Sequence, residues 1–84
     1  MDTHLATPTV HMNGTSRDAL LDQLFDAINA IHEAGKKLAR ACPNGRDYYT
    51  QGAAALNEAL LQHEGRMAKL KSVTDELKEI AEQM

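Results

Sequence analysis

Two short polar clusters in this chain combine the residue types that hold anions and stack against flat ligands. The first is His11-Met12-Asn13-Gly14-Thr15-Ser16, and the second is Pro43-Asn44-Gly45-Arg46-Asp47-Tyr48-Tyr49. Arg46 offers a fork of N–H donors suited to phosphate or carboxylate, while Tyr48 and Tyr49 offer aromatic faces and hydroxyls. The second cluster therefore has the chemistry of a nucleotide pocket.

The first cluster has residue types that bind an anion at the start of a helix. An Asn13-Gly14 turn leads into the hydroxyls of Thr15 and Ser16, with His11 just before it. Free amides at a helix N-terminus favour a negative charge. The predicted ligand-binding residues are Arg46, Tyr48, Tyr49, Asn13, Gly14, Thr15, Ser16 and His11.

Each cluster also has a purely structural interpretation. In the second cluster, one tyrosine closes the end of a helical hairpin, Asp47 caps the following helix, and Arg46 pairs with a carboxylate. In the first, an ordinary turn precedes a helix cap provided by Thr15 or Ser16, and Thr15 with Asp18 fits the reciprocal capping pattern. The residue types leave open whether the clusters form one site, two sites or only helix caps.

Two long segments with apolar residues at steps of three and four must position these clusters. They predict two amphipathic helices, over residues 16–42 and 53–84, joined by a turn over residues 43–52. The first helix is expected to end at Pro43, because the residue before a proline is pushed out of the helical region. The residues predicted to face the partner helix are Leu21, Leu24, Ile28, Ile31, Gly35, Leu38 and Cys42, and then Ala53, Leu56, Leu60, His63, Met67, Leu70, Thr74, Leu77, Ala81 and Met84.

The predicted fold is all-α, an antiparallel two-helix coiled-coil-like hairpin behind an irregular N-terminal arm over residues 1–14. The chain has 84 residues, and a lone helix pair of that size is marginal, so we expect a homo-oligomer. The second helix is the longer one. Its last turns, with Ile80 and Met84, are therefore expected to overhang. They would need cover from a neighbouring subunit, from the arm, or from both, and the apolar residues of the arm are Leu5, Val10 and Met12.

The first helix separates the two polar clusters. Its length of about 26 residues, at about 1.5 Å each, places them roughly 39 Å apart. They cannot meet within one subunit. If they form one site, the arm of one subunit must reach the turn of another.

Other residue types give little indication of chemistry. We call the residues predicted to face the partner helix the seam. His63 lies in this seam and is expected to be a hydrogen-bonded core residue, and Cys42 is expected to be a buried structural thiol. The four histidines lack the pairing of a zinc site, and the sequence shows no catalytic triad or phosphate loop. We therefore expect no enzyme activity, no metal and no cofactor.

Charge and hydropathy restrict the partners. The net charge of −3 argues against a duplex nucleic acid partner. No apolar run approaches the length of a membrane span, and the first residues lack the basic and apolar regions of a signal peptide. The single cysteine excludes an internal disulfide and fits a reducing compartment. We expect a cytoplasmic protein with no membrane partner.

The two cluster motifs resemble those of a group of small proteins from tailed bacteriophages. The resemblance extends over residues 11–84, with the Asn-Gly-Arg-Asp-Tyr-Tyr string as its specific part. It implies a phage or prophage origin, and thus the cytoplasm of a host cell. In architecture alone, the chain is also similar to phage anti-defence sponges, small helical oligomers that sequester cyclic nucleotides.

These observations lead to one hypothesis and one alternative. The hypothesis is a non-enzymatic homo-oligomer that sequesters a small anionic ligand, such as a cyclic nucleotide, at sites between subunits. Arg46 would hold phosphate, Tyr48 or Tyr49 would stack, and residues 13–16 would add amide and hydroxyl donors. The alternative is a structural or protein-binding coiled-coil adaptor that acts through a helix face.

Overall fold

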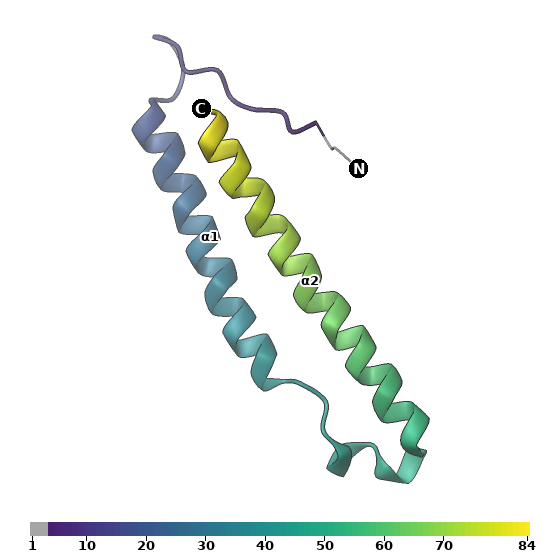
Figure 1. The fold of residues 1–84 in the computed structure, drawn as a ribbon. Coiled ribbons are helices and arrows are strands. Elements are labelled where there is room, and N and C mark those ends of the chain that lie inside the picture. The colour runs from purple at the N-terminus through teal and green to yellow at the C-terminus, as the bar shows by residue number, and fades with distance from the viewer. Residues whose placement is uncertain (1–3) are drawn as a thin grey trace.

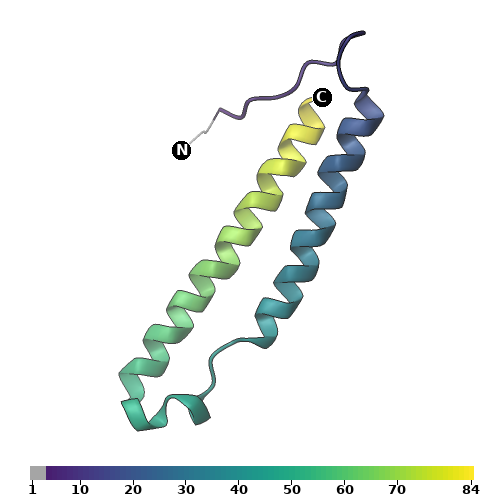
Figure 2. The ribbon, with the colours of Figure 1, turned by 180° about the vertical axis from the view of Figure 1, so that it is seen from behind.

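The computed structural model describes residues 4–84, so the first three residues of the predicted arm lie outside it. Two long helices, α1 (Arg17–Arg40) and α2 (Ala53–Gln83), run side by side in opposite directions (Figures 1 and 2). The part of the chain described contains no strand, which confirms the all-α prediction. The molecule is long and narrow, with extents of 62 × 27 × 15 Å, as a helical hairpin requires.

Helix α1 begins where the sequence predicts. Ser16 has extended backbone angles, and its hydroxyl oxygen accepts a hydrogen bond from the amide of Ala19 at 3.2 Å. This bond satisfies one of the amides that a helix start leaves without a partner. Of the two predicted capping residues, Ser16 is thus the one used, and the reciprocal pattern of Thr15 with Asp18 does not form.

Helix α1 ends two residues earlier than predicted. Its last residue is Arg40, and the Cys42 amide donates to the Ala39 carbonyl at 3.2 Å, which closes a tighter final turn. Such tightening is common at helix ends. Because α1 stops at Arg40, Cys42 leaves the seam and is exposed, so the expected buried thiol is wrong.

The connection between the helices contains two short 3-10 turns, η1 (Gly45–Asp47) and η2 (Tyr49–Gln51). Gly52 follows with φ 100° and ψ 162°, a backbone conformation that is accessible essentially only to glycine. Helix α2 then begins at Ala53, the predicted residue.

Helix α2 is longer than α1, and its extra turns lie at the connection, not at the C-terminal end as predicted. At the free end, the Arg17 Nε–H donates to the main-chain oxygen of Met84 at 3.5 Å, so the start of α1 lies level with the end of α2. The surplus of α2, with 31 residues against 24 in α1, therefore extends beyond α1 at the connection. There the connection covers it, since a Cβ on Gly45 would lie 3.9 Å from the Leu56 side chain. The predicted overhang of the C-terminal turns is wrong.

The N-terminal arm crosses the free end of the hairpin (Figure 1). The Thr7 hydroxyl donates to Oε1 of Gln83 at 2.7 Å, and Leu5 is half-buried. Val10 and Met12, which were expected to help to cover this end, are instead 44% and 97% exposed. The arm therefore provides part of the cover from within the chain.

The seam between the helices is shallow. Of the residues described, only Ile28, His63, Thr74 and Ala81 are buried. Most other residues predicted to face the partner helix are half-buried, and Cys42 and Ala53 are exposed. Two helices thus cover each other along one line and leave the sides of that line open to solvent. No helix within residues 4–84 combines the length and apolar character needed to cross a membrane.

Candidate functional site

The polar cluster in the connection is organised by Asn44. Its Oδ1 accepts from the Arg46 amide at 3.0 Å, and its Nδ2 donates to Oδ2 of Asp47 at 3.1 Å. The Asp47 amide in turn donates to the Asn44 carbonyl at 3.2 Å. Asp47 was expected to cap the second helix, and this is wrong, because Gly52 precedes α2 without a side-chain cap. Asn44 and Asp47 are engaged in stabilising the turn.

The side chains of Arg46, Tyr48 and Tyr49 make none of the hydrogen bonds that stabilise the turn, and they differ in their surroundings. The Arg46 side chain is exposed and makes no ion pair or hydrogen bond within the described chain. Tyr49 is 78% exposed, whereas Tyr48 is half-buried. Arg46 and Tyr49 therefore keep their donors and aromatic surface free for a ligand or another molecule.

The arm cluster is a compact turn before α1. The Gly14 amide donates to the His11 carbonyl at 3.2 Å. The His11 ring folds back over the turn, since its Nε2 lies 2.6 Å from where a Cβ on Gly14 would stand. Ser16 is engaged in capping the helix, and Asn13 and Thr15 are exposed. The cluster presents polar groups to solvent, but the Ala19 amide, one of the helix-start donors that could hold an anion, is already bonded to the Ser16 hydroxyl oxygen.

The two clusters lie at opposite ends of α1 (Figure 1). The 24 residues of α1 correspond to about 36 Å of helix. Within one chain the arm cluster and the connection cluster therefore form separate surfaces, as the helix length predicts. The proposal that they form one site between subunits stays a prediction.

A feature that the sequence analysis missed is an open groove along one side of the seam. One part, of about 300 Å³, is lined by Ile31, His32, Gly35, Met67, Leu70, Lys71, Thr74, Asp75 and Lys78. A second part, of about 290 Å³, is lined by Arg17, Leu21, Phe25, Lys78, Ala81 and Glu82. Because Lys78 borders both parts, they lie on the same face of the hairpin. We call this surface the groove face.

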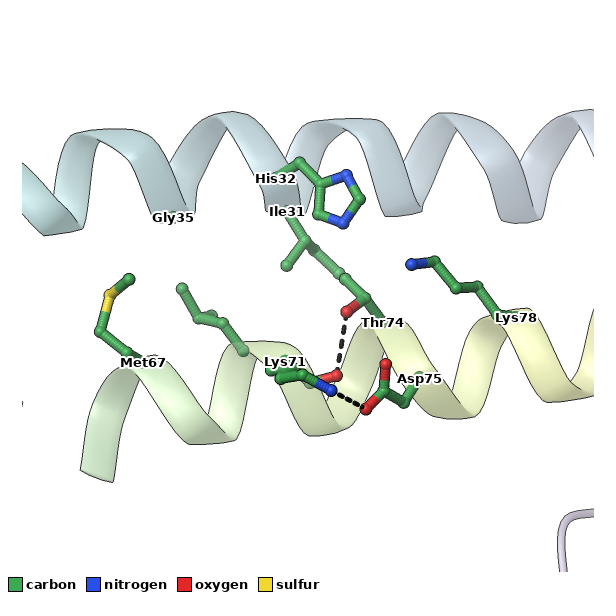
Figure 3. Close-up of a pocket in the computed structure, with 9 residues that line it drawn as sticks. Ile31, His32, Gly35, Met67, Lys71, Thr74, Asp75 and Lys78 are labelled. Atoms are coloured by element: carbon green, nitrogen blue, oxygen red, sulfur yellow. Dashed lines mark hydrogen bonds and ion pairs between the residues drawn. The ribbon is translucent and has the colours of Figure 1, made fainter. Parts of the chain in front are cut away.

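Figure 3 shows the first part of the groove face, with Met67 and Gly35 towards one end and the His32 ring and Lys78 towards the other. The floor is apolar, and a Cβ on Gly35 would meet nothing within 4 Å. The Thr74 hydroxyl is turned to its own helix, where it donates to the Lys71 carbonyl at 2.9 Å. The groove is therefore an apolar depression with a charged rim.

The charged rim contains one ion pair. Lys71 Nζ lies 2.8 Å from Oδ2 of Asp75, with both side chains largely exposed. The hydrogen bond from Lys71 is the largest cause that lowers the pKa of Asp75, desolvation opposes it, and the nearby charges of Lys71 and Lys78 lower this pKa further. Exposed pairs of this kind contribute little to stability, and Lys78 remains available on the rim.

The sequence carried one signal for this surface. Phe25 and His32 lie seven residues apart on α1, beside the predicted seam, and Lys71 and Lys78 have the same spacing on α2. Residues seven apart share a helix face. Only the packing of α1 against α2 shows that the two stripes border one groove.

Neither polar cluster borders the groove face, and no three potential ligands among residues 4–84 gather into a metal site. His63 is buried in the seam at 7% exposure. Comparison of the chain with family models, with curated proteins and with solved structures finds no match. The resemblance to tailed-phage proteins therefore stays a prediction.

Proposed function

We propose that this chain is a non-enzymatic helical hairpin that self-associates and acts as a structural or adaptor protein through its helix faces. The observation that carries this proposal is the shallow seam. Only four of the described residues are buried, while rows of Leu, Ile and Met along both helices remain half-exposed. A chain this small gains little stability from such a core, and association would bury the remaining apolar surface.

The proposal is tested by measuring mass and thermal stability over a range of protein concentrations. Sedimentation equilibrium is expected to give a mass above that of one chain at micromolar concentration. The melting temperature is expected to rise with concentration, because association stabilises only the folded state. A single-chain mass together with a concentration-independent melting temperature would rule out self-association.

A second candidate function is capture of a small anionic ligand by the connection. It is supported by the exposed Arg46 side chain, which has no partner among residues 4–84, and by the 78% exposure of Tyr49. In an oligomer, such groups could combine with the polar arm of a neighbouring subunit. The ligand would then be sequestered without conversion, as expected of a phage-encoded anti-defence sponge that binds a cyclic nucleotide.

This candidate is tested by thermal shift against mono-, di- and cyclic nucleotides. A ligand at one hundred times its dissociation constant should stabilise the fold by about 2.7 kcal/mol. Arg46→Ala and Tyr49→Ala should abolish the shift, because they remove the guanidinium and the aromatic face, whereas Arg66→Ala, at an exposed arginine on α2, should leave it intact. A shift that persists in Arg46→Ala, or no shift with any nucleotide, contradicts this assignment.

A further inference from the structure

The groove face has an apolar projection as well as an apolar depression. Phe25 is 48% exposed and lines one part of the groove. Gly35 lines the other part, above a floor that includes Ile31, Met67 and Leu70. Because Gly35 lacks a side chain and its Cβ position is open, the depression could accept a side chain from outside. Phe25 cannot fill it within the chain, since ten residues of helix separate the two by about 15 Å.

We propose that the groove face binds a second copy of this chain around a two-fold axis, with Phe25 of each copy inserted beside Gly35 of the other. This inference rests on the proposed self-association and specifies its surface. In a two-fold interface every contact is made twice. A face with one projection and one depression can therefore place its projection in the depression of the other copy and receive that copy's projection in return. The axis would pass beside α1, level with residue 30 and midway between the two positions, and would pair the two α1 helices antiparallel.

The charges along α1 fit the same alignment. Asp18 and Asp22 lie on the Phe25 side of the first half of α1, and Lys36 and Arg40 lie on that side of the second half. With the axis at residue 30, Asp22 of one copy lies within one turn of Lys36 of the other. Asp18 likewise lies within one turn of Arg40. A parallel alignment would instead bring like charges together, so charge complementarity favours the two-fold arrangement.

Within its own chain, Lys36 makes only a weak interaction, with Glu33. Lys36 Nζ lies 3.1 Å from Oε1 of Glu33, with the two side chains 71% and 66% exposed. Exposed pairs of this kind contribute little and exchange readily. Lys36 can therefore turn to Asp22 of a second copy without losing a strong interaction.

The size of the face is sufficient for a dimer. A stable interface takes roughly 800 Å² from each partner. The broad side of this hairpin measures 62 × 27 Å, and the described chain exposes 6525 Å² in all. The contact would bury the half-exposed side chains of Phe25, Met67 and Leu70, which supply the apolar centre that such interfaces have.

The test fills the depression and compares the result with a matched control. Gly35→Leu should improve helix propensity and leave the single chain intact, because its Cβ meets nothing within 4 Å. It should nevertheless raise the dimer dissociation constant at least about tenfold, as should Phe25→Ala, which removes the projection. Gly65→Leu is the control, since Gly65 is equally open but does not line the groove. Its dissociation constant should stay within about twofold of the original.

Cross-linking provides a second measurement, which reports directly on the distance between the two positions in the dimer. In a Cys42→Ser background, a mixture of Phe25→Cys and Gly35→Cys chains should form a covalent dimer on oxidation. A mixture of Phe25→Cys and Gly65→Cys chains should not.

Two results would contradict the proposed surface. The first is an associated protein in which Gly35→Leu behaves like Gly65→Leu, and in which the mixture of Phe25→Cys and Gly35→Cys chains gives no excess covalent dimer. This result overturns the surface and leaves self-association standing. The second is a protein that is monomeric throughout, which overturns both.

Discussion

The two long helices each follow an Asn-Gly turn, yet they begin by different means. Asn13-Gly14 leads within three residues into α1, whose first turn is capped by the Ser16 hydroxyl. Asn44-Gly45 leads only into a 3-10 turn that Asn44 itself caps, and α2 starts eight residues after Gly45, beyond Gly52. The same dipeptide therefore has two outcomes. What decides between them is the direction in which the chain must continue.

At α1 the chain arrives along the arm and needs only a side-chain acceptor. At α2 it must first pass the surplus turns of the longer helix and reverse through the two 3-10 turns, and Gly52 then leads into α2 at φ 100° and ψ 162°. One helix start depends on a side chain and the other on the absence of one. Substitutions at the two starts should therefore follow different rules.

The largest expected effect is at Gly52. Gly52→Ala should destabilise the fold by about 1–3 kcal/mol, because a Cβ is strained in this backbone conformation. Gly65→Ala is the control, since among the described residues only Gly52 has a positive φ. In the middle of α2, this second substitution should stabilise by about 0.5–1 kcal/mol. Urea unfolding at one protein concentration measures both, and changes of the same sign would contradict the role given to Gly52.

The next effect is at the start of α1. Ser16→Ala removes the acceptor for the Ala19 amide and should cost about 1 kcal/mol. Ser72→Ala, at an exposed position inside α2, should cost nothing or stabilise slightly, because alanine is the better helix former. Unfolding curves for Ser16→Ala and Ser72→Ala distinguish the loss of a helix cap from the effect of replacing any serine with alanine. Equal effects would mean that Ser16 does not act as a cap.

A smaller effect is expected where the arm meets α2. Thr7→Val removes the hydroxyl that donates to Gln83 and should cost about 0.5 kcal/mol, since the bond is exposed. Thr9→Val is the control, because Thr9 is exposed and its hydroxyl makes no hydrogen bond within residues 4–84. Amide hydrogen exchange at the end of α2 should quicken in Thr7→Val alone. Unchanged exchange would show that the arm does not protect this end.

The smallest effect on stability is expected in the connection cluster. Arg46→Ala should change the free energy of unfolding by less than about 0.5 kcal/mol, because the side chain is exposed and has no partner in the described structure. Asn44→Ala should cost more, since it breaks the hydrogen bonds to Arg46 and Asp47. A large loss in Arg46→Ala without ligand would indicate a structural role and would weaken the case for anion capture.

The sequence predicted much of the fold and less of the candidate site. The positions of both clusters at opposite ends of α1 followed from helix length alone. The sequence did not predict which side chains of a cluster form its internal hydrogen bonds. Asn44, Asp47 and Arg46 could pair in several ways, and their spacing in the sequence does not favour one of them. The groove face was missed because its two sides come from residues more than thirty apart in the chain.

What the sequence by itself determined are the local features. The apolar period determined two helices, Ser16 determined where α1 begins, and the proline at position 43 determined that α1 stops near it. The tertiary structure alone decided that Cys42 is exposed, that the surplus turns of α2 lie at the connection, and that Phe25 and Gly35 share an open face. The physical reason is that helix formation and capping depend on neighbours within about four residues. Burial depends on how two helices align, and the path of the connection sets that alignment.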